Sequence, residues 1–199
     1  QNQYSPPLPI FITYVLLVLS VAGGVMNYAL TYQGIKWGSS TYGTSGGVIL
    51  WSPWTQNFGG EAFYFTSGIS EQMVLEVEQA MRAWEAVANV SFARTSDQSI
   101  LNTTGLRIGQ GPGDGAGGTE GLARRYSPTS DNTTKAAQIW IDAGEGWHLS
   151  GGRVVDSGGN LFYQIILHEL GHVLGLAHFD GAPTVMNSVV NNITQLTAG

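Results

Sequence analysis

Cysteine is absent from this chain of 199 residues, so a disulfide framework, a thiolate metal site and a cysteine nucleophile are all excluded. Charged residues are scarce at 11% of the sequence, against roughly 25% in an average soluble domain, which excludes disorder driven by charge. The eight Lys and Arg residues are scattered through a chain of net charge −6. Without a basic face to neutralise phosphates, nucleic acid is not expected as a partner. The length suits one domain with a sizeable core.

The N-terminal part of the chain lacks charge altogether, because Lys36 is the first charged residue. Within it, residues 10–25 are nearly all apolar, although neither an initiator methionine nor a basic segment precedes them. The run is interpreted as the apolar region of an export signal, as a membrane anchor of roughly 20 residues, or as a buried strand or helix of the core. We expect residues 1–30 to be an export signal or anchor, and residues 31–199 to form the folded domain.

Turn residues divide the rest of the chain into short segments with strand or helix patterns. The helix pattern is clearest over residues 70–88, where Ser70 is placed to act as N-cap and apolar residues recur every three or four positions. A second helix is expected to begin near Asn160. Short apolar segments between Gly, Ser, Thr and Pro predict strands at residues 36–38, 48–51, 62–65, 90–92, 106–108 and 138–141.

A glycine-rich segment, GQGPGDGAGGTEG, covers residues 109–121. It lacks the lysine of a phosphate-binding loop, and no helix pattern follows its glycines, so a phosphate site is not expected. We interpret the segment as a structural loop or as a calcium loop built from backbone carbonyls.

Histidines are clustered, since three of the four in the chain lie within residues 168–178. His168 and His172 are four residues apart, so on a helix their imidazoles project from the same face and can bind one zinc ion. Glu169 then lies next to the metal, where a carboxylate can take a proton from a metal-bound water.

His178 lies six residues beyond His172, and on a continuous helix the two would face nearly opposite sides. The helix must therefore end between them, and Gly175 can adopt the left-handed conformation that ends a helix. Three neutral histidines leave a fourth coordination position open, which is typical of a catalytic zinc site. The alternative is a helix whose histidines are merely exposed or packed.

The pattern HExxHxxGxxH from His168 to His178 resembles the zinc signature of the metzincin metallopeptidases. Metzincins also have a methionine turn beneath the zinc, and Met186 follows His178 by eight residues, a spacing similar to that of matrixins and serralysins. Three further segments are similar to those families: residues 70–92 to their first helix and following strand, residues 117–123 to their glycine-rich loop and edge strand, and Phe162-Tyr163 to the aromatic pair that opens their active-site helix.

The resemblance spans residues 36–186 and implies an α+β (α/β-like) fold. The expected sheet is twisted and mixed, mostly parallel with one antiparallel edge strand, and two long helices and a short C-terminal subdomain accompany it. The resemblance also implies a substrate cleft between the zinc and the edge strand, where Leu122 and Ala123 lie.

The chain departs from the matrixins at their second, structural zinc site. The positions of two of its histidine ligands are matched by Arg124 and Trp140, neither of which can ligate a cation, so only one zinc is expected. Asp142 and Glu145 match the carboxylates by which matrixins hold calcium, and the alternative is a solvated acidic turn.

Other family features are also missing. Ser188 stands where serralysins and astacins place a tyrosine, so a tyrosine that stabilises the oxyanion is not expected. The chain ends at Gly199, and we expect it to lack the C-terminal helix of related domains. The lone histidine outside the motif, His148, is interpreted as a surface residue.

These patterns predict a secreted, monomeric zinc endopeptidase of matrixin or serralysin type that acts on proteins or peptides. One catalytic zinc is held by His168, His172 and His178, and Glu169 acts as general base and then general acid. Calcium is a second cofactor if the acidic turn binds it. Two alternatives stay open: a catalytically silent metal-binding or adhesion module, and a membrane-anchored enzyme that differs only in retaining residues 10–25.

Overall fold

The computed structural model describes residues 15–21, 24–30, 35–39, 41, 43–56, 63–101, 103–126, 133–189, 191 and 193–196. The helices are α1 (Glu71–Val87), α2 (Gln98–Leu101) and α3 (Phe162–Leu174), with a 3-10 turn at Ala143–Glu145. The strands are β1 (Val15–Val21), β2 (Gly24–Leu30), β3 (Lys36–Trp37), β4 (Gly47–Pro53), β5 (Val90–Arg94), β6 (Gly105–Gly111), β7 (Gly121–Tyr126), β8 (Thr133–Thr134), β9 (Ala136–Asp142), β10 (His148–Ser150) and β11 (Arg153–Val155).

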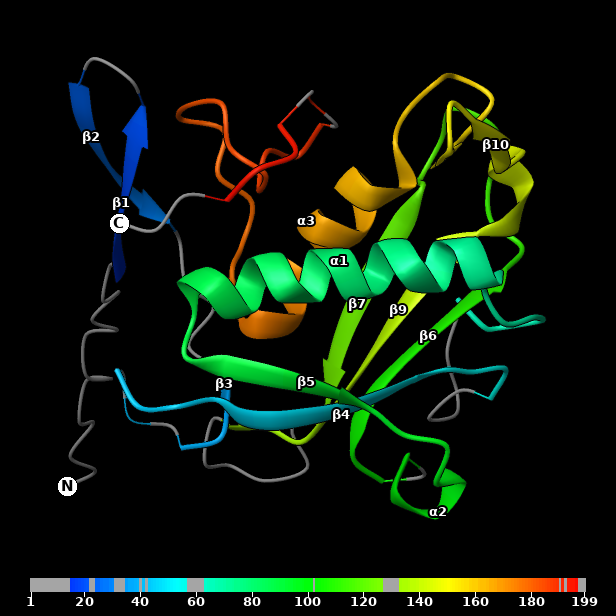
Figure 1. Cartoon of the computed structure of the whole chain (residues 1–199), viewed down its shortest axis with the longest axis horizontal. Coiled ribbons are helices and arrows are strands. Elements are labelled where there is room, and N and C mark those ends of the chain that lie inside the picture. The colour runs from blue at the N-terminus through cyan, green and yellow to red at the C-terminus, as the bar shows by residue number, and fades with distance from the viewer. Residues whose placement is uncertain are drawn as a thin grey trace, which may run out of the picture.

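The central sheet has five strands in the order β5-β4-β6-β9-β7. Its first four strands run parallel, whereas β7 pairs antiparallel with β9 and forms an edge. The mixed sheet, its antiparallel edge strand and the two long helices confirm the predicted fold (Figure 1). As an edge strand, β7 pairs with a strand of this sheet on one side only.

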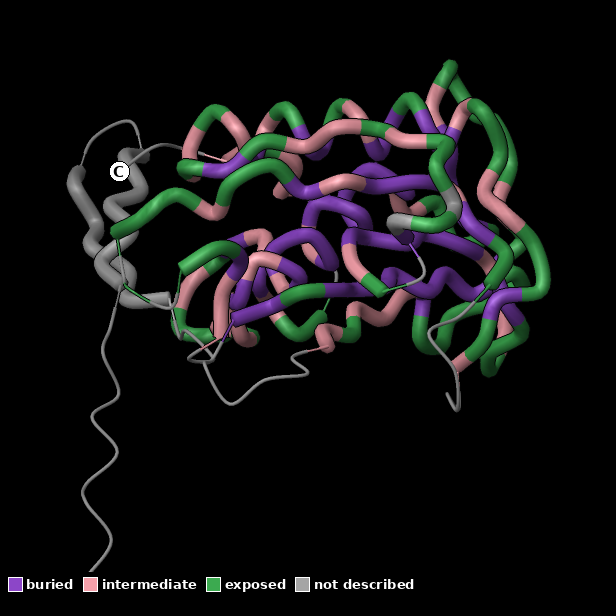
Figure 2. Tube along the Cα trace, turned by 90° about the horizontal axis from the view of Figure 1, so that it is seen from below, coloured by how far each residue is buried: buried purple, intermediate pink, exposed green. Residues whose placement is uncertain are grey.

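Helices α1 and α3 pack against each other and share one apolar core with the sheet. In Figure 2 the buried part of the chain runs through the middle of the molecule, between exposed outer segments. Two buried indoles fix α3 in this core, since Nε1 of Trp84 donates to Leu167 O and Nε1 of Trp37 donates to Val173 O, each at 3.0 Å. The helix that carries the histidine cluster is therefore held from two directions.

The first long helix begins as the sequence predicts. The Ser70 side chain accepts a hydrogen bond from the Met73 N–H at 3.3 Å, which satisfies one of the free donors at the helix start. Its stripe of Val74, Val77 and Trp84 is buried in the core.

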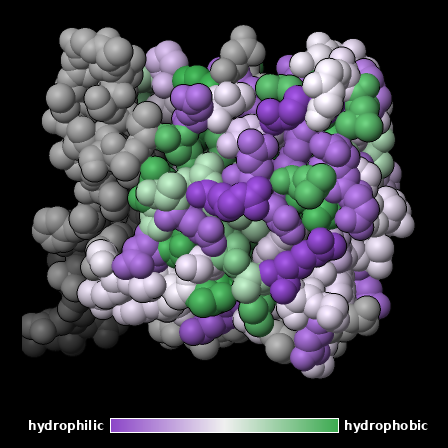
Figure 3. Space-filling model, viewed as in Figure 1, coloured by the Kyte–Doolittle hydropathy of each residue, from purple (hydrophilic) through white to green (hydrophobic). Residues whose placement is uncertain are grey.

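On the face viewed in Figure 3, hydrophilic side chains are interspersed with smaller hydrophobic patches.

The strand predicted at residues 62–65 is wrong for residues 63–65, which form irregular coil. This coil covers the face of the sheet opposite the helices, where Phe65 and Trp140 are buried. It can lie so close because β6 presents Gly109 and Gly111 there, and a Cβ on either would overlap the covering chain. The glycine-rich loop accordingly begins after Gly111 instead of at Gly109.

The N-terminal strands β1 and β2 pair antiparallel in a two-stranded sheet that is separate from the five-stranded sheet. Residues 1–14, 22 and 23 of the predicted signal or anchor lie outside the described residues, as do residues 31–34 at the start of the predicted domain. Among the described residues, no helix has both the length and the apolar character needed to span a bilayer.

Candidate metal centre and cleft

Three histidines converge at the C-terminal half of α3. His168 and His172 lie one turn apart, with ring centroids separated by 4.6 Å, and His178 approaches them to 5.2 and 4.7 Å. Each residue offers one ring nitrogen to a group whose members all lie within 4.8 Å of one another. His178 reaches this position because Gly175 has a φ of 111° and ends the helix, as the sequence predicts.

Backbone carbonyls orient two of the rings. Nδ1 of His168 donates to Val185 O at 2.7 Å, and Nδ1 of His172 donates to Leu176 O at 2.8 Å. With Nδ1 protonated, each ring keeps an unprotonated Nε2 for a ligand. Burial lowers the pKa of His168 and brings the pKa of His172 down to about 4, so both rings are neutral at pH 7. Two neutral, oriented imidazoles and a third that converges on them fit a zinc ion.

Glu169 is buried beside this group, between α3 and the edge strand. Its Oε2 has no hydrogen-bond partner among the described residues. Burial raises the pKa of Glu169 to about 8, against the opposing effect of a hydrogen bond from the Ala123 backbone. A Cβ at Gly121 would come within 3.3 Å of Glu169 Cγ, so the strand packs directly onto the carboxyl-bearing residue. A buried carboxyl with a free oxygen is able to hold or release a proton.

Met186 lies beneath the histidines, as expected of a methionine turn. Its side chain is fully buried, and its sulfur lies against Gly171 of α3. Met186 O accepts from the Phe179 N–H at 2.8 Å, and the Asn187 Oδ1 accepts from the Thr184 N–H at 2.8 Å. These bonds hold the turn that presents the carbonyl of residue 185 to His168.

A cleft of about 870 Å³ opens over these groups. The three histidines and Glu169 line it together with Leu122 and Ala123 of β7, so the predicted edge strand does border the same space. Its described lining also includes Val185, Asn187 and Ser188 from the turn after His178. The cleft is thus bounded by an edge strand, a helix and a turn.

A second group of ligand atoms lies at the end of β9. Asp142 and Glu145 are fully buried, so the interpretation as a solvated turn is wrong. Asp114 from the glycine-rich loop joins them, with carboxylate oxygens within 4.8 Å of one another. Sequence analysis missed Asp114, although an acid within a glycine-rich loop is a usable signal.

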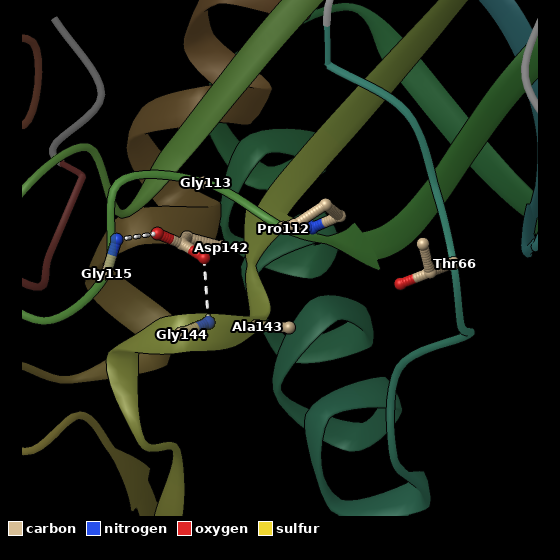
Figure 4. A pocket seen from close by; sticks show the side chains of 7 residues that line it. All are labelled: Thr66, Pro112, Gly113, Gly115, Asp142, Ala143 and Gly144. Carbon is tan, nitrogen blue, oxygen red and sulfur yellow. Dashed lines mark hydrogen bonds between the residues drawn. The ribbon is translucent and has the colours of Figure 1, made fainter.

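Backbone amides of the loop already turn toward these carboxylates. Gly115 N–H and Gly144 N–H donate to the two oxygens of Asp142 at 2.8 and 2.7 Å (Figure 4). Gly117 N–H donates to Glu145 Oε2 at 2.9 Å, while Glu145 Oε1 has no partner among the described residues. A shallow pocket of about 390 Å³ borders Asp142 on the side of Pro112 and Thr66.

The positions that match the structural-zinc ligands of matrixins are used differently. Arg124 is exposed on β7, whereas Trp140 is fully buried and lies 4.9 Å from Phe63 between ring centroids. His148 is exposed on β10 and stays apart from the histidine cluster. An aromatic contact therefore occupies the place where related domains have a metal ligand.

The other end of the cleft is acidic, which sequence analysis did not detect. Glu120 lines the cleft, and its side chain has 9% of its surface exposed. Burial and then the nearby Asp156 carboxylate raise the pKa of Glu120 to about 7.

Comparison with known proteins gives a consistent result. The family model described as Matrixin matches residues 64–198. Stromelysin-2 of Rattus norvegicus is 32% identical over 117 residues, 57% of this chain and 22% of that protein. Matrix metalloproteinase-15 of Homo sapiens is 30% identical over 122 residues, or 55% and 17% of the two chains. The hatching enzyme of Paracentrotus lividus is 34% identical over 140 residues, which are 65% of this chain and 21% of that protein. The matched segment thus spans less than a quarter of these relatives.

Proposed function

Because the chain belongs to the matrixin family, we propose that it is a zinc-dependent endopeptidase. The observation that carries the proposal is the buried Glu169 carboxyl, which has an unpartnered oxygen beside three converging histidines. A helix with merely packed histidines would have no need of a buried acid at that point, because an unpaired buried carboxyl costs stability.

His168, His172 and His178 are the zinc ligands in this proposal. When bound, zinc supplies Lewis acidity that polarises a peptide carbonyl and acidifies water. Val185 and Leu176 contribute their carbonyls, which keep two of the rings in the correct tautomer.

Glu169 moves the protons. Its buried carboxyl has a free oxygen beside the histidines, where it can both accept and return a proton. It accepts the proton of the attacking water and then delivers it to the nitrogen of the leaving amine. Ser188, in place of a tyrosine, leaves the turn without a phenol to assist the developing oxyanion.

The edge strand binds the substrate. An extended peptide adds to β7 on the side away from β9 through main-chain hydrogen bonds, and Leu122 and Ala123 place it over Glu169. This mode suits protein or peptide substrates and requires no second copy of the chain, so the enzyme acts as a monomer.

Asp114, Asp142 and Glu145 form a calcium site that fixes the glycine-rich loop. Oxygen ligands close together are the donors that calcium prefers, and the unpartnered Glu145 Oε1 supports a cation there. The loop leads directly into β7, so calcium supports the substrate-binding strand without taking part in the chemistry.

The enzyme acts outside the cell. Residues 1–30 serve as export signal or as anchor, and N-terminal sequencing of the mature protein distinguishes a secreted form from an anchored one.

The test is Glu169→Gln, which removes the proton-transferring group and keeps the side chain's size. Hydrolysis of a quenched peptide library should fall by about 10² to 10⁴, the usual contribution of a positioned general base, while zinc content stays at one per chain. His172→Ala should lose zinc as well, and His148→Ala is the matched histidine control that should change neither.

Retained hydrolysis in Glu169→Gln would show that the base is misassigned. A zinc-loaded wild type that cleaves no member of the library would favour the silent metal-binding module.

A further inference from the structure

The cleft continues past the histidines to the start of α3. Gln164 and His168, one turn apart on α3, and Asn160, just before the helix, all line it. Glu120, the residue before β7, lines the cleft at this end. A pocket therefore extends from Glu169 toward an acidic end between β7 and α3.

Only one of the two carboxylate oxygens of Glu120 has a hydrogen-bond partner among the described residues. Its Oε1 accepts from Asn160 Nδ2 at 2.7 Å, and the same nitrogen donates to Asp156 Oδ2 at 2.9 Å. Its Oε2 is buried and has no hydrogen-bond partner among the described residues. Gln164, next along the cleft, donates its Nε2 to Asn191 Oδ1 at 3.1 Å. A ligand group that carries positive charge can supply the donor that this buried oxygen lacks, and it is attracted by the second carboxylate.

No such donor comes from the cleft's own arginines. Arg124 and Arg125 line the cleft, but they lie toward the C-terminal end of β7, whereas Glu120 precedes its first residue. The unmatched group is thus complementary to an organic cation that reaches it along the cleft.

The cleft also has apolar lining. Ile165 of α3, Leu122 of β7 and Val185 of the methionine turn line it together with Glu169 and Glu120. An aliphatic stem that ends in a cation matches this combination of surfaces, since lysine and arginine bury their methylene groups and place the charge at a polar end.

We propose that Glu120 is a specificity-determining residue, and that the pocket beside Glu169 selects a substrate residue with a lysine or arginine side chain next to the scissile bond. The proposal rests on the proposed peptidase function. The terminal nitrogen of the substrate side chain donates to the free Oε2 of Glu120. The buried carboxylate of Asp156 adds a second negative charge that attracts it, and Asn160 holds both carboxylates in place.

The first experiment uses the zinc-loaded full chain and peptides that differ only at the residues flanking the scissile bond. At one flanking position, arginine and lysine peptides should have kcat/KM about 10- to 100-fold above the norleucine peptide, the value of one charge-assisted hydrogen bond. Glu120→Gln should abolish the difference between the basic and the norleucine peptides. Glu78→Gln, a carboxylate half-exposed on α1, is the matched control and should keep the preference.

The second experiment does not depend on cleavage. Titration of the wild type with n-butylguanidine, followed by NMR of the Asn160 side-chain amide, should give a saturable shift that Glu120→Gln loses and Glu78→Gln keeps. A wild type that cleaves peptides without preferring basic residues overturns the specificity assignment and leaves the peptidase intact. A wild type that cleaves nothing yet binds n-butylguanidine overturns the peptidase function alone, and absence of binding overturns the pocket itself.

Discussion

The Glu120 carboxyl loses its hydration when the chain folds, and the Asp156 carboxylate beside it opposes a second charge. Both effects raise the pKa of Glu120 from 4.5 to about 7. The folded state therefore holds the proton more tightly than the unfolded state does. Its contribution to stability is greatest below pH 4.5 and is lost as the pH rises toward 7.

Replacing Glu120 with glutamine should remove this pH dependence, because an amide has no proton to lose. The free energy of unfolding of Glu120→Gln should exceed that of the wild type by on the order of 1–3 kcal/mol at pH 8, and the difference should shrink toward pH 5. Urea unfolding at several pH values measures it, with Glu78→Gln as the control. A difference that does not change with pH would contradict the raised pKa.

Single residues also show what sequence can reveal about the site. His168, His172 and Gly175 are readable because their roles depend on local helix geometry, in which spacing determines direction. Glu120 and Asp114 are not readable in the same way. Each is one acid in a glycine-rich segment, and its role arises only when the fold brings a distant residue such as Asn160 or Asp142 against it.

At the scale of elements, Gly171 joins α3 to two other parts of the structure. A Cβ at this position would overlap the sulfur of Met186 and come within 3.1 Å of Trp84. In an open helix, alanine would be more favourable than glycine by about 1 kcal/mol. At Gly171 the close packing should reverse this preference, so that alanine is less favourable than glycine.

Gly171→Ala should therefore destabilise the protein by about 1–3 kcal/mol, the usual cost of overpacking. It should also weaken zinc binding, because displacement of Met186 moves the Val185 carbonyl that orients His168. Chemical denaturation and zinc competition with a chelator measure the two effects. Gly68→Ala, at a position with nothing within 4 Å, is the control, and a stabilised Gly171→Ala would show that the turn yields easily.

Elements were predictable where one face is buried and the pattern is long. The helix at residues 70–88 is such a case, since its apolar stripe determines both its period and its orientation. The predicted strand at residues 62–65 failed because aromatic residues favour strands and also cover sheets. Here Phe65 covers β6 across Gly109, and no local pattern distinguishes the two roles.

At the scale of the whole molecule, the two candidate metal sites are supported by different kinds of structure. The histidine cluster is built on a helix fixed by buried indoles, whereas the acidic cluster joins a glycine-rich loop to the end of β9. The sheet was predictable through the family resemblance, because strand order depends on contacts between distant segments that composition does not encode. The separate pairing of β1 with β2 was not predictable, since an apolar run alone fits strand, helix and signal equally.

Metal analysis of the dialysed protein should give one zinc per chain, because exposed Arg124 and the aromatic-packed Trp140 offer no ligand for a second. Calcium should raise the free energy of unfolding by about 2.7 kcal/mol at a concentration 100 times its Kd, since it neutralises three carboxylates held within 4.8 Å. Asp114→Asn should lose most of this gain, and Glu78→Gln should keep it. Thermal unfolding with calcium and with chelator measures the effect, while peptide hydrolysis at low temperature should continue without calcium. Two tightly held zinc ions per chain would contradict the assignment of Arg124 and Trp140 as positions without a metal ligand. Equal stabilisation of Asp114→Asn and the wild type by calcium would contradict the calcium site at the acidic cluster.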